Sequence, residues 1–527
     1  MLGRLRNTDV GQLPIALSII VLVAVCNLLY VGFACPFDLA PDEAHYWDWS
    51  RNLDWCFYSK GPLVAVLIHL GCALFGDTPF GVRFPAILCG MLLHLAIWLL
   101  ALRTSNSPRF ALIVLLCALT LPGLSAVSLI MTIDAPFLCL WAWSAVFVHR
   151  AVFGGHAWNW LAAGACVALG HLTKQSMVLF PLSITLWFLF QPSHRDQLRK
   201  SGFWFFLVFG SLGLLPMILW NFQHEWIGFR HLLGMSGVGQ KSFRWFGPLA
   251  FAGEQLGFLL VFWFIAWITG IVQAIQQKCP QQMFLVYLSL PIWIVCALAS
   301  FGNAGQPNWP AAAYISGFVL AVQAIQRGAS AIISPVWLNR TFAAAIICGI
   351  SISIVLRWPG MLRPIAAELV AAPTRDVPCP VRKLDPTARL LGWRTLAKEV
   401  DAVRARVRSE TGTDPLIATM TWTVPGELGF YCDGHPQVYS FGFALADRMS
   451  QYDVWRPNPV HDAQAFAGRT FVYVGFKLPR SAFDRVKRVA EVVHRENGVP
   501  VAAWEIWVCE GFRGFQQEAE HGTPARY

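Results

Sequence analysis

Long apolar runs alternate with short polar turns along the first two thirds of this 527-residue chain. Each run is long enough, or nearly so, to cross a hydrocarbon core of about 30 Å. About eleven membrane helices are expected, starting near Leu13, Val82, Phe110, Ala135, Trp158, Ser176, Gly202, Phe246, Met283, Trp309 and Thr341. The runs stop near residue 356. The pattern therefore predicts a polytopic α-helical membrane protein.

After these runs, the pattern becomes that of a globular α/β domain. It predicts an amphipathic helix over 392–408, strands over 415–420, 437–441, 470–476 and 501–508, and a helix over 480–489. We therefore expect a membrane domain over 1–358 and an extracytoplasmic α/β domain over 359–527. The first external loop, 34–81, is expected to carry interfacial helices.

Basic residues predict the orientation of the chain. With the N-terminus in the cytoplasm, every expected cytoplasmic turn is basic, as the positive-inside rule requires: Arg103, Arg109, Arg150, Arg195, Arg199, Lys200, Lys278, Arg327 and Arg340. The net charge of +10 is scattered rather than gathered in a stripe, so no nucleic-acid partner is expected. The first run lacks a small-residue cleavage site, which favours a retained signal anchor. In a bacterium, the chain would span the inner membrane with its C-terminal domain in the periplasm.

Polar residues gather in the first external loop, directly after the first apolar run. Pro41, Asp42 and Glu43 begin a helix, because proline suits the first turn and acids suit the positive end of the helix dipole. Cys35 and Cys56 flank this segment, and either a disulfide or two free thiols fits the sequence. Charged groups at a bilayer boundary are costly and point to function.

A carboxylate beside cations suits glycosyl transfer from a lipid phosphate. The carboxylate takes the proton from an acceptor hydroxyl, and the cations stabilise the phosphate as it leaves. Structural roles are open for the same residues. Asp42 and Glu43 could only cap an interfacial helix, Lys60 and Arg83 could be snorkelling anchors, and Asp134 could be an N-terminal cap.

Short motifs follow one another in a characteristic order: Pro41-Asp42-Glu43-Ala44-His45-Tyr46, Tyr58-Ser59-Lys60-Gly61-Pro62, Leu74-Phe75-Gly76-Asp77, Phe80-Gly81-Val82-Arg83, Asp134-Ala135-Pro136, Thr173-Lys174, Asn308-Trp309-Pro310 and Arg448-Met449-Ser450-Gln451-Tyr452-Asp453-Val454-Trp455. Together they resemble the GT-C glycosyltransferases of the bacterial PMT-like group, which includes lipid A aminoarabinose transferases and is related to protein O-mannosyltransferases. Related members often carry Lys-Pro-Pro or His-Pro-Pro where this chain has Lys60-Gly61-Pro62.

The resemblance implies roles for individual residues. Asp42 matches the catalytic base of the family, with Glu43 as its neighbour and acceptor ligand. Lys60 matches the family's lysine that contacts the polyprenyl phosphate, and Arg83 matches the basic residue that opens the second span. We expect Lys60, Arg83 and Lys174 to bind the donor phosphate. Acceptor or sugar binding is expected of Asp134, His45, Tyr46, Tyr58 and Asn308. No cofactor is expected to be required, although a divalent cation shared by the acids is compatible with the sequence.

The expected reaction moves a sugar, with inversion, from a polyprenyl-phosphate donor to an extracytoplasmic acceptor. The acceptor would be lipid A or lipopolysaccharide, another glycan or a protein, and the other partners would be membrane lipids. A transporter or flippase is the main alternative, because ionisable groups in membranes also mark transport paths. A lipid-linked glycan ligase or polymerase, which would use a diphosphate donor, and a non-catalytic scaffold are further alternatives. The candidate residues gather on one side and no inverted repeat is visible, which favours the transferase.

Overall fold

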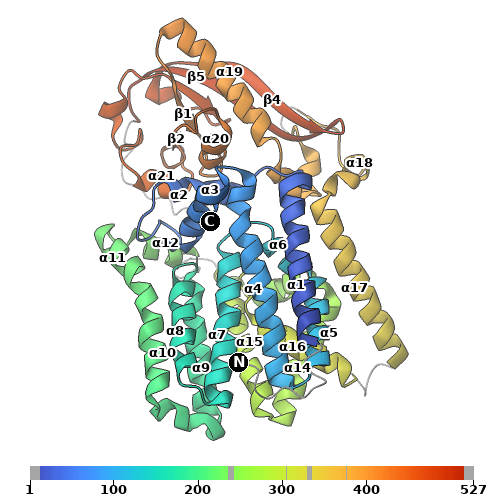
Figure 1. Cartoon of the computed structure of the whole chain (residues 1–527). Coiled ribbons are helices and arrows are strands. Elements are labelled where there is room, and N and C mark those ends of the chain that lie inside the picture. Colours follow the sequence, from blue (N-terminus) through green and yellow to red (C-terminus); the bar gives the residue numbers. More distant parts are fainter. Residues whose placement is uncertain (1–11, 236–242, 304, 329–334, 375–376, 516–527) are drawn as a thin grey trace.

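The computed structural model describes residues 12–235, 243–303, 305–328, 335–374 and 377–515. A bundle of long helices carries a smaller α/β layer on one end (Figure 1). Among the described residues, seven helical segments are long and apolar enough to cross a membrane. They are α1 (Gln12–Leu29, continued by a π-helical turn to Ala34), α4 (Pro79–Ser105), α7 (Asp134–Gly154), α10 (Ser201–Ser211) joined to α11 (Leu215–Gln223), α14 (Leu260–Gln277), α15 (Pro280–Ala299) and α17 (Pro335–Arg357). Shorter helices complete the bundle: α5 (Pro108–Leu119), α6 (Pro122–Val127), α8 (Trp158–His171), α9 (Leu179–Phe190), α13 (Gly247–Phe258) and α16 (Ala313–Gln326).

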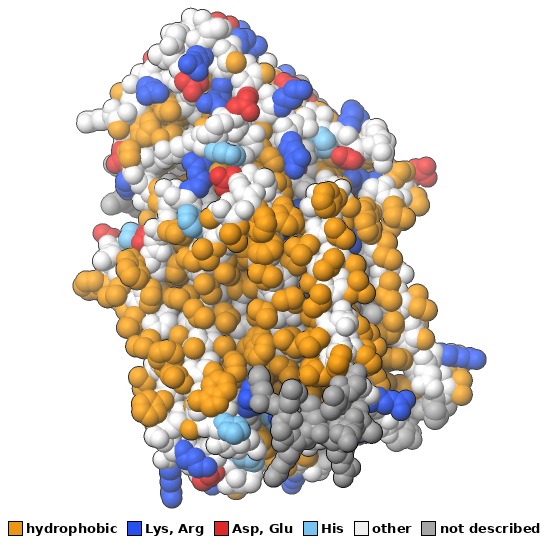
Figure 2. Space-filling view, in the orientation of Figure 1, with side chains coloured by type: hydrophobic (Ala, Val, Ile, Leu, Met, Phe, Trp, Pro, Cys, Tyr) orange, Lys and Arg blue, Asp and Glu red, His pale blue; other side chains and the backbone are white. Residues whose placement is uncertain are grey.

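The sides of the bundle are covered by apolar side chains. Figure 2 shows a broad hydrophobic belt with charged residues above and below it. Large apolar side chains of the helices, such as Leu22, Leu74, Phe205 and Leu219, are exposed. An apolar surface of this extent is typical of contact with lipid. The prediction of a polytopic helical membrane protein is confirmed.

Three helices lie where the bundle meets the α/β layer: α2 (Pro41–Arg51), α3 (Leu63–Phe75) and α12 (Ile227–Met235). The 13 residues of α3 make a helix about 20 Å long, which is too short to cross a bilayer. Because α2 and α3 both lie in the segment between α1 and α4, that segment supplies helices to the boundary between the two layers.

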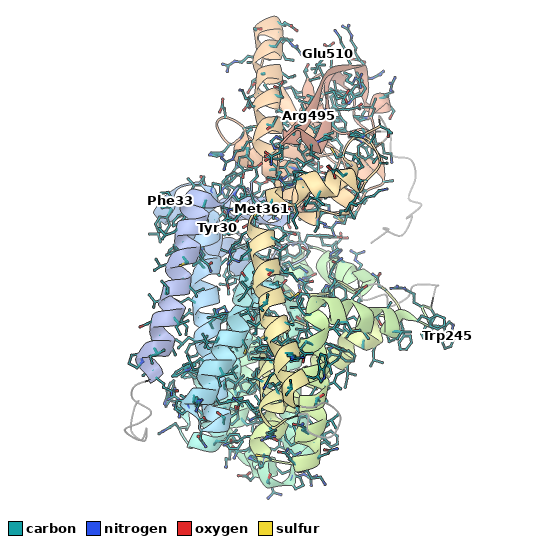
Figure 3. The ribbon with its side chains drawn as sticks, turned by 90° about the vertical axis from the view of Figure 1, so that its right-hand side faces the viewer. Tyr30, Phe33, Trp245, Met361, Arg495 and Glu510 are labelled. Atoms are coloured by element: carbon teal, nitrogen blue, oxygen red, sulfur yellow. The ribbon has the colours of Figure 1, made fainter. Side chains whose placement is uncertain are left out.

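The α/β layer contains one five-stranded sheet in the order β2-β1-β3-β5-β4. Strands β1 and β2, and β1 and β3, are parallel, whereas β3, β5 and β4 pair antiparallel. Leu396 and Val400 of helix α19 (Trp393–Thr411) share one apolar core with Ile417 and Val472 of the sheet. The chain reaches this layer through α17 and the segment around Met361 (Figure 3). The elements are α18 (Arg363–Glu368), α19 (Trp393–Thr411), β1 (Leu416–Thr419), α20 (Pro425–Tyr431), β2 (Val438–Ser440), α21 (Gln451–Val454), β3 (Phe471–Val474), β4 (Phe483–Glu496) and β5 (Val499–Phe512).

One predicted element of this layer is wrong. The segment 480–489, predicted as a helix, instead begins the 14-residue strand β4. Its partner β5 pairs with it from Phe483↔Phe512 to Glu496↔Val499. The several valines of β4 favour a strand, and the long antiparallel pairing with β5 supplies hydrogen-bond partners along one edge of it.

The C-terminal layer is docked closely on α2. A Cβ atom added at Gly426 of α20 would lie 2.6 Å from the carbonyl of Ala44 in α2, so only glycine allows this approach. The Leu39 backbone N–H donates to the Tyr431 hydroxyl at 2.7 Å, and the Trp393 N–H donates to Asp38 Oδ2 at 2.9 Å. These contacts place the start of α2 between the bundle and the C-terminal layer.

Candidate active site

Asp42 lies in the first turn of α2, at the boundary between the two layers. Its side chain is exposed, and its carboxylate makes no hydrogen bond or ion pair with any described residue. Desolvation by the surrounding protein raises the pKa of the Asp42 carboxyl above its ordinary value of 3.8, and the charges of Arg448 and Lys60 oppose that rise. An accessible, unpaired carboxylate with a raised pKa is suited to act as a general base.

Glu43 has a different environment from its neighbour. Its side chain is fully buried and accepts hydrogen bonds from the backbone N–H of Ala40 at 2.8 Å and of Met131 at 2.9 Å. Arg83 donates to the same carboxylate through Nε at 3.0 Å and through Nη2 at 2.8 Å. Glu43 therefore caps the first turn of α2 through the Ala40 N–H and binds α2 to α4.

The guanidinium of Arg83 is likewise hydrogen-bonded on all sides within this cluster. Its Nη2 donates to the Asp38 carbonyl at 2.7 Å, and its Nη1 donates to Cys35 Sγ at 3.3 Å. Cys35 forms no disulfide with Cys56, and both are free thiols. The structure thus argues against two predicted roles. Both Glu43 oxygens accept hydrogen bonds within this cluster, so neither is free to contact an acceptor. The Arg83 guanidinium donates to Glu43, Asp38 and Cys35, so no edge of it is free to contact a phosphate.

Replacing Glu43 with glutamine is expected to destabilise the protein rather than to impair chemistry directly. Removing one partner of a buried ion pair typically costs about 3–5 kcal/mol. The thermal unfolding temperature of Glu43→Gln in detergent measures this loss. The exposed pair Arg485–Glu510 supplies the control, since Glu510→Gln should change stability by less than about 0.5 kcal/mol. Equal stability of the two variants would contradict the structural role of Glu43.

Lys60 lies in the loop between α2 and α3. Its backbone carbonyl accepts from the Phe57 N–H at 3.0 Å, whereas its ammonium group has no hydrogen-bond or ion-pair partner among the described residues. Burial lowers the pKa of Lys60 to about 8, and the charge of Lys174 adds to that effect. An unpaired, partly desolvated ammonium is a suitable ligand for a phosphate.

Gly61 explains the departure from the Lys-Pro-Pro pattern. A Cβ atom at this position would lie 2.3 Å from the carbonyl oxygen of Leu172. The same oxygen accepts from the Leu63 N–H at 2.9 Å, and Gln175 Nε2 donates to the Ser59 carbonyl at 3.2 Å. The Lys60 loop is therefore fixed against the turn that precedes Lys174, and this close approach requires glycine.

Gly61→Ala is consequently expected to displace Lys60 and to raise the apparent Kd for polyprenyl phosphate by about tenfold or more, equivalent to one lost charge-assisted hydrogen bond. Titration of the purified variant with polyprenyl phosphate measures the effect. Gly253→Ala is the matched control, because a Cβ at Gly253 meets nothing within 4 Å. Unchanged affinity in Gly61→Ala would show that the loop packing does not position Lys60.

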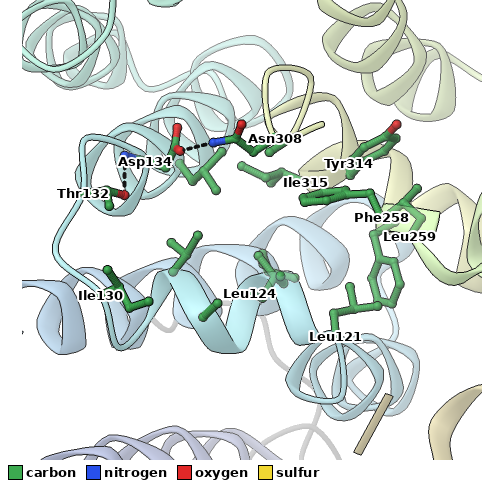
Figure 4. Close-up of a pocket in the computed structure, with 17 residues that line it drawn as sticks. Leu121, Leu124, Ile130, Thr132, Asp134, Phe258, Leu259, Asn308, Tyr314 and Ile315 are labelled. Carbon is green, nitrogen blue, oxygen red and sulfur yellow. Dashed lines mark hydrogen bonds between the residues drawn. The ribbon is translucent and has the colours of Figure 1, made fainter. Parts of the chain in front are cut away.

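Asp134, Lys174 and Asn308 form a second polar cluster. Lys174 Nζ donates to Asp134 Oδ1 at 2.8 Å. Asn308 Nδ2 donates to Asp134 Oδ2 at 2.6 Å (Figure 4). Three segments that are far apart in sequence thus meet at the start of α7. Because Lys174 is already paired with Asp134, Lys60 is the more available of the two lysines for binding an anion.

An apolar cavity of about 270 Å³ opens next to this cluster. Figure 4 shows Asp134 and Asn308 at one edge and aliphatic and aromatic side chains around the remainder. The walls come from α6, α13 and α16 and include Leu124, Phe258 and Ile315. A cavity with an apolar body and a polar edge can accommodate an amphiphile.

The three aromatic candidates of the first loop have different surroundings. His45 is buried between Trp49 and Trp422, with ring centroids 4.8 and 5.3 Å away. Burial lowers the pKa of His45 to about 3, so the ring is neutral and serves the docking of the two layers.

Tyr46 is also buried, and the charges of Asp42 and Asp134 act on its hydroxyl. Tyr58 is buried, and its backbone N–H donates to Gln451 Oε1 at 2.7 Å.

Arg448 is a candidate that the sequence alone did not assign to the site. Its guanidinium carbon lies 4.1 Å from the centroid of the Trp422 ring. The positive charge of Arg448 lowers the pKa of Asp42 more than the charge of Lys60 does. The motif beginning at Arg448 was visible in the sequence, but its distance from Asp42 along the chain gave no sign that they face each other.

Across the described residues, no group of three His, Cys, Asp or Glu side chains is arranged to hold a metal ion. That the reaction needs no cofactor stays a prediction. The chemistry available from the described side chains is proton transfer at Asp42 and binding of anionic oxygens by Lys60 and Arg448.

Comparison with known proteins agrees with this chemistry. The family of dolichyl-phosphate-mannose-protein mannosyltransferases matches residues 59–220, under a third of the chain. The lipid A galacturonosyltransferase RgtD of Rhizobium johnstonii is 28% identical over 295 residues, which cover 54% of this chain and 60% of that protein. An undecaprenyl phosphate-alpha-4-amino-4-deoxy-L-arabinose arabinosyl transferase of Edwardsiella ictaluri is 30% identical over 218 residues, covering 37% and 38%. The alignments thus span less than two thirds of either relative.

A solved structure resembles the chain over nearly its whole length. ArnT from Cupriavidus metallidurans bound to undecaprenyl phosphate matches with a TM-score of 0.59 and 16% identity, covering 93% of this chain and 97% of that one. At this identity the likeness shows the fold. The expected GT-C fold and the resemblance to PMT-like glycosyltransferases are confirmed.

Proposed function

We propose that this chain is a membrane glycosyltransferase that moves a sugar from a polyprenyl-phosphate donor to an extracytoplasmic acceptor. The observation that carries the proposal is that Asp42, an accessible carboxylate, and the Lys60 ammonium lie at one end of a membrane bundle, act on each other electrostatically and have no bonding partner among the described residues. A base and a phosphate ligand in one site are the two groups that this transfer requires.

The reaction is a single displacement. Asp42 takes the proton from the acceptor hydroxyl while the acceptor oxygen bonds to the anomeric carbon. The bond from that carbon to the phosphate oxygen breaks, and Lys60 stabilises the negative charge on the departing phosphate. Because the acceptor attacks the face opposite the leaving group, the anomeric configuration inverts.

The apolar cavity beside Asp134 supports a lipid-linked donor. Its walls suit the first units of a prenyl chain, and its polar edge carries Asp134, whose charge acts on Lys60. A prenyl chain in this cavity would hold its phosphate near the bundle end that carries Asp42. The ligand named for the matching ArnT structure, undecaprenyl phosphate, belongs to the same chemical class.

The finer assignments concern the substrates and the membrane. The names of the relatives support a hexosyl or pentosyl donor and a lipid A acceptor, since they describe galacturonosyl transfer to lipid A and 4-amino-4-deoxy-L-arabinosyl transfer. The basic turns at the bundle end distant from Asp42 support an inner-membrane protein whose active site and C-terminal layer face the periplasm.

The pH dependence follows from the two unpaired groups. The value of kcat/KM should rise with pH as Asp42 loses its proton, at a pKa above the ordinary 3.8. It should fall again above about pH 8, where Lys60 becomes neutral and no longer attracts the phosphate. Initial rates in detergent between pH 4 and about pH 10 measure the profile. The descending limb should move to higher pH in Lys60→Arg, because a guanidinium stays charged; an unmoved limb would exclude Lys60 as its source.

A deletion strain tests the proposal as a whole. Mass spectrometry of its polyprenyl-phosphate sugars and envelope glycans should reveal accumulated donor together with a glycan that lacks one sugar. Those two species would name both substrates. An unchanged donor pool and unchanged glycans would contradict the proposed function.

A further inference from the structure

Arg448 belongs to the C-terminal layer but is held at the boundary with the bundle. Trp422 lies beneath its guanidinium, at 4.1 Å from the ring centroid. Trp422 in turn contacts His45 of α2, with ring centroids 5.3 Å apart. Since His45 lies one helical turn after Asp42, this stack fixes Arg448 relative to the candidate base.

A second connection ties the same segment to the Lys60 loop. Gln451, three residues after Arg448, accepts a 2.7 Å hydrogen bond from the backbone N–H of Tyr58, and Tyr58 lies two residues before Lys60. Arg448 is thus anchored towards both Asp42 and Lys60.

Apart from its contact with Trp422, the guanidinium has no polar partner among the described residues. It donates no hydrogen bond and forms no ion pair with any of the residues that the structure describes, although Asp42 and Asp447 act on it electrostatically. Five N–H donors held over an aromatic face are pre-organised for an anion with planar or tetrahedral oxygens. A comparable arginine over an aromatic ring, Arg394 on Tyr431, is instead paired with Asp38 at 3.0 Å.

We propose that Arg448 is a substrate-binding residue supplied by the C-terminal layer, which binds anionic oxygens of the sugar donor beside Asp42 and together with Lys60. These oxygens belong either to the donor phosphate or to a carboxylate on the sugar, as in a uronic acid. The inference rests on the proposed function and extends it, because it makes the donor site incomplete without the C-terminal layer.

Two measurements on purified Arg448→Ala distinguish the sources. In the first, titration with polyprenyl phosphate, which lacks the sugar, gives the affinity for the lipid phosphate alone. In the second, kcat/KM is compared for a uronosyl and a neutral-sugar polyprenyl-phosphate donor. Arg485→Ala is the control, since Arg485 is exposed on the outer strand β4 of the same layer.

If the phosphate is the ligand, Arg448→Ala should weaken polyprenyl phosphate binding by roughly 10- to 100-fold, the value of a charge-assisted hydrogen bond. If a sugar carboxylate is the ligand, polyprenyl phosphate affinity should stay unchanged while the uronosyl donor alone loses a similar factor in kcat/KM. Where Arg448→Ala does not fold, Arg448→Gln, which keeps most of the side chain over Trp422, gives the same comparison.

Unchanged affinity with equal kcat/KM losses for both donors, accompanied by a shifted acidic limb of the pH profile, would overturn the inference. In that case Arg448 would only adjust the charge of Asp42. The proposed function fails separately, if the wild-type protein neither binds polyprenyl phosphate saturably nor consumes any lipid-linked donor.

Discussion

Asp42→Asn is expected to abolish sugar transfer while leaving the protein folded and able to bind the donor lipid. The amide cannot accept the acceptor proton, and loss of a general base typically lowers kcat by about 10²- to 10⁴-fold. Stability should be preserved because the Asp42 carboxylate has no bonding partner among the described residues to lose. Turnover per folded molecule and polyprenyl phosphate binding, measured on one preparation, separate the two properties.

The adjacent acid provides the contrast for this experiment. Glu43→Gln should lower the yield of folded protein, because Glu43 is fully buried against Arg83. Asp42→Asn should lower turnover instead. Full transfer activity in Asp42→Asn would remove Asp42 from the role of base.

Lys60→Ala is expected to raise the donor KM by roughly 10- to 100-fold, because a charge-assisted hydrogen bond to the phosphate is lost. A decrease in kcat should accompany it, since the same ammonium stabilises the leaving phosphate. Initial rates at varied donor concentration measure both constants. Lys60→Arg should recover part of the loss because it restores the charge.

The control for this variant is Lys200→Ala. Lys200 is half exposed in a turn predicted to be cytoplasmic, and its ammonium pairs with Asp196, one turn earlier in the chain. Its removal should leave the donor KM unchanged. A donor KM in Lys60→Ala equal to that of this control would exclude Lys60 from the donor site.

Much of the fold could be predicted from the sequence because membrane helices are specified locally. An apolar run crosses a bilayer through its own backbone hydrogen bonds, so its composition is sufficient to identify it. The strand β4 could not be identified in this way. Its charged residues and valines suit a helix face as well as a solvent-exposed strand, and only its pairing with β5 decides between them.

The site could be predicted only in part, for a similar reason. Asp42 and Lys60 are conspicuous as charges beside apolar runs, and neither side chain pairs with any residue that the structure describes. Glu43 and Arg83 looked equivalent to them in sequence. Their burial against each other depends on the packing of α2 on α4, which no local pattern reveals.

Arg448 illustrates what lies beyond local pattern altogether. Its place near Asp42 depends on the docking of α20 on α2, which in turn depends on the absence of a side chain at Gly426. The sequence marks the segment around Arg448 as part of a motif without indicating what it faces.

The central claim is that Asp42 drives sugar transfer from a polyprenyl-phosphate donor. Its most direct test is mass spectrometry of lipid-linked sugars and envelope glycans in a deletion strain that expresses either the wild-type chain or Asp42→Asn at equal membrane levels. The wild-type chain should restore the complete glycan and clear the accumulated donor, whereas Asp42→Asn should leave the donor accumulated and the glycan one sugar short. Restoration of the glycan by Asp42→Asn would contradict the claim.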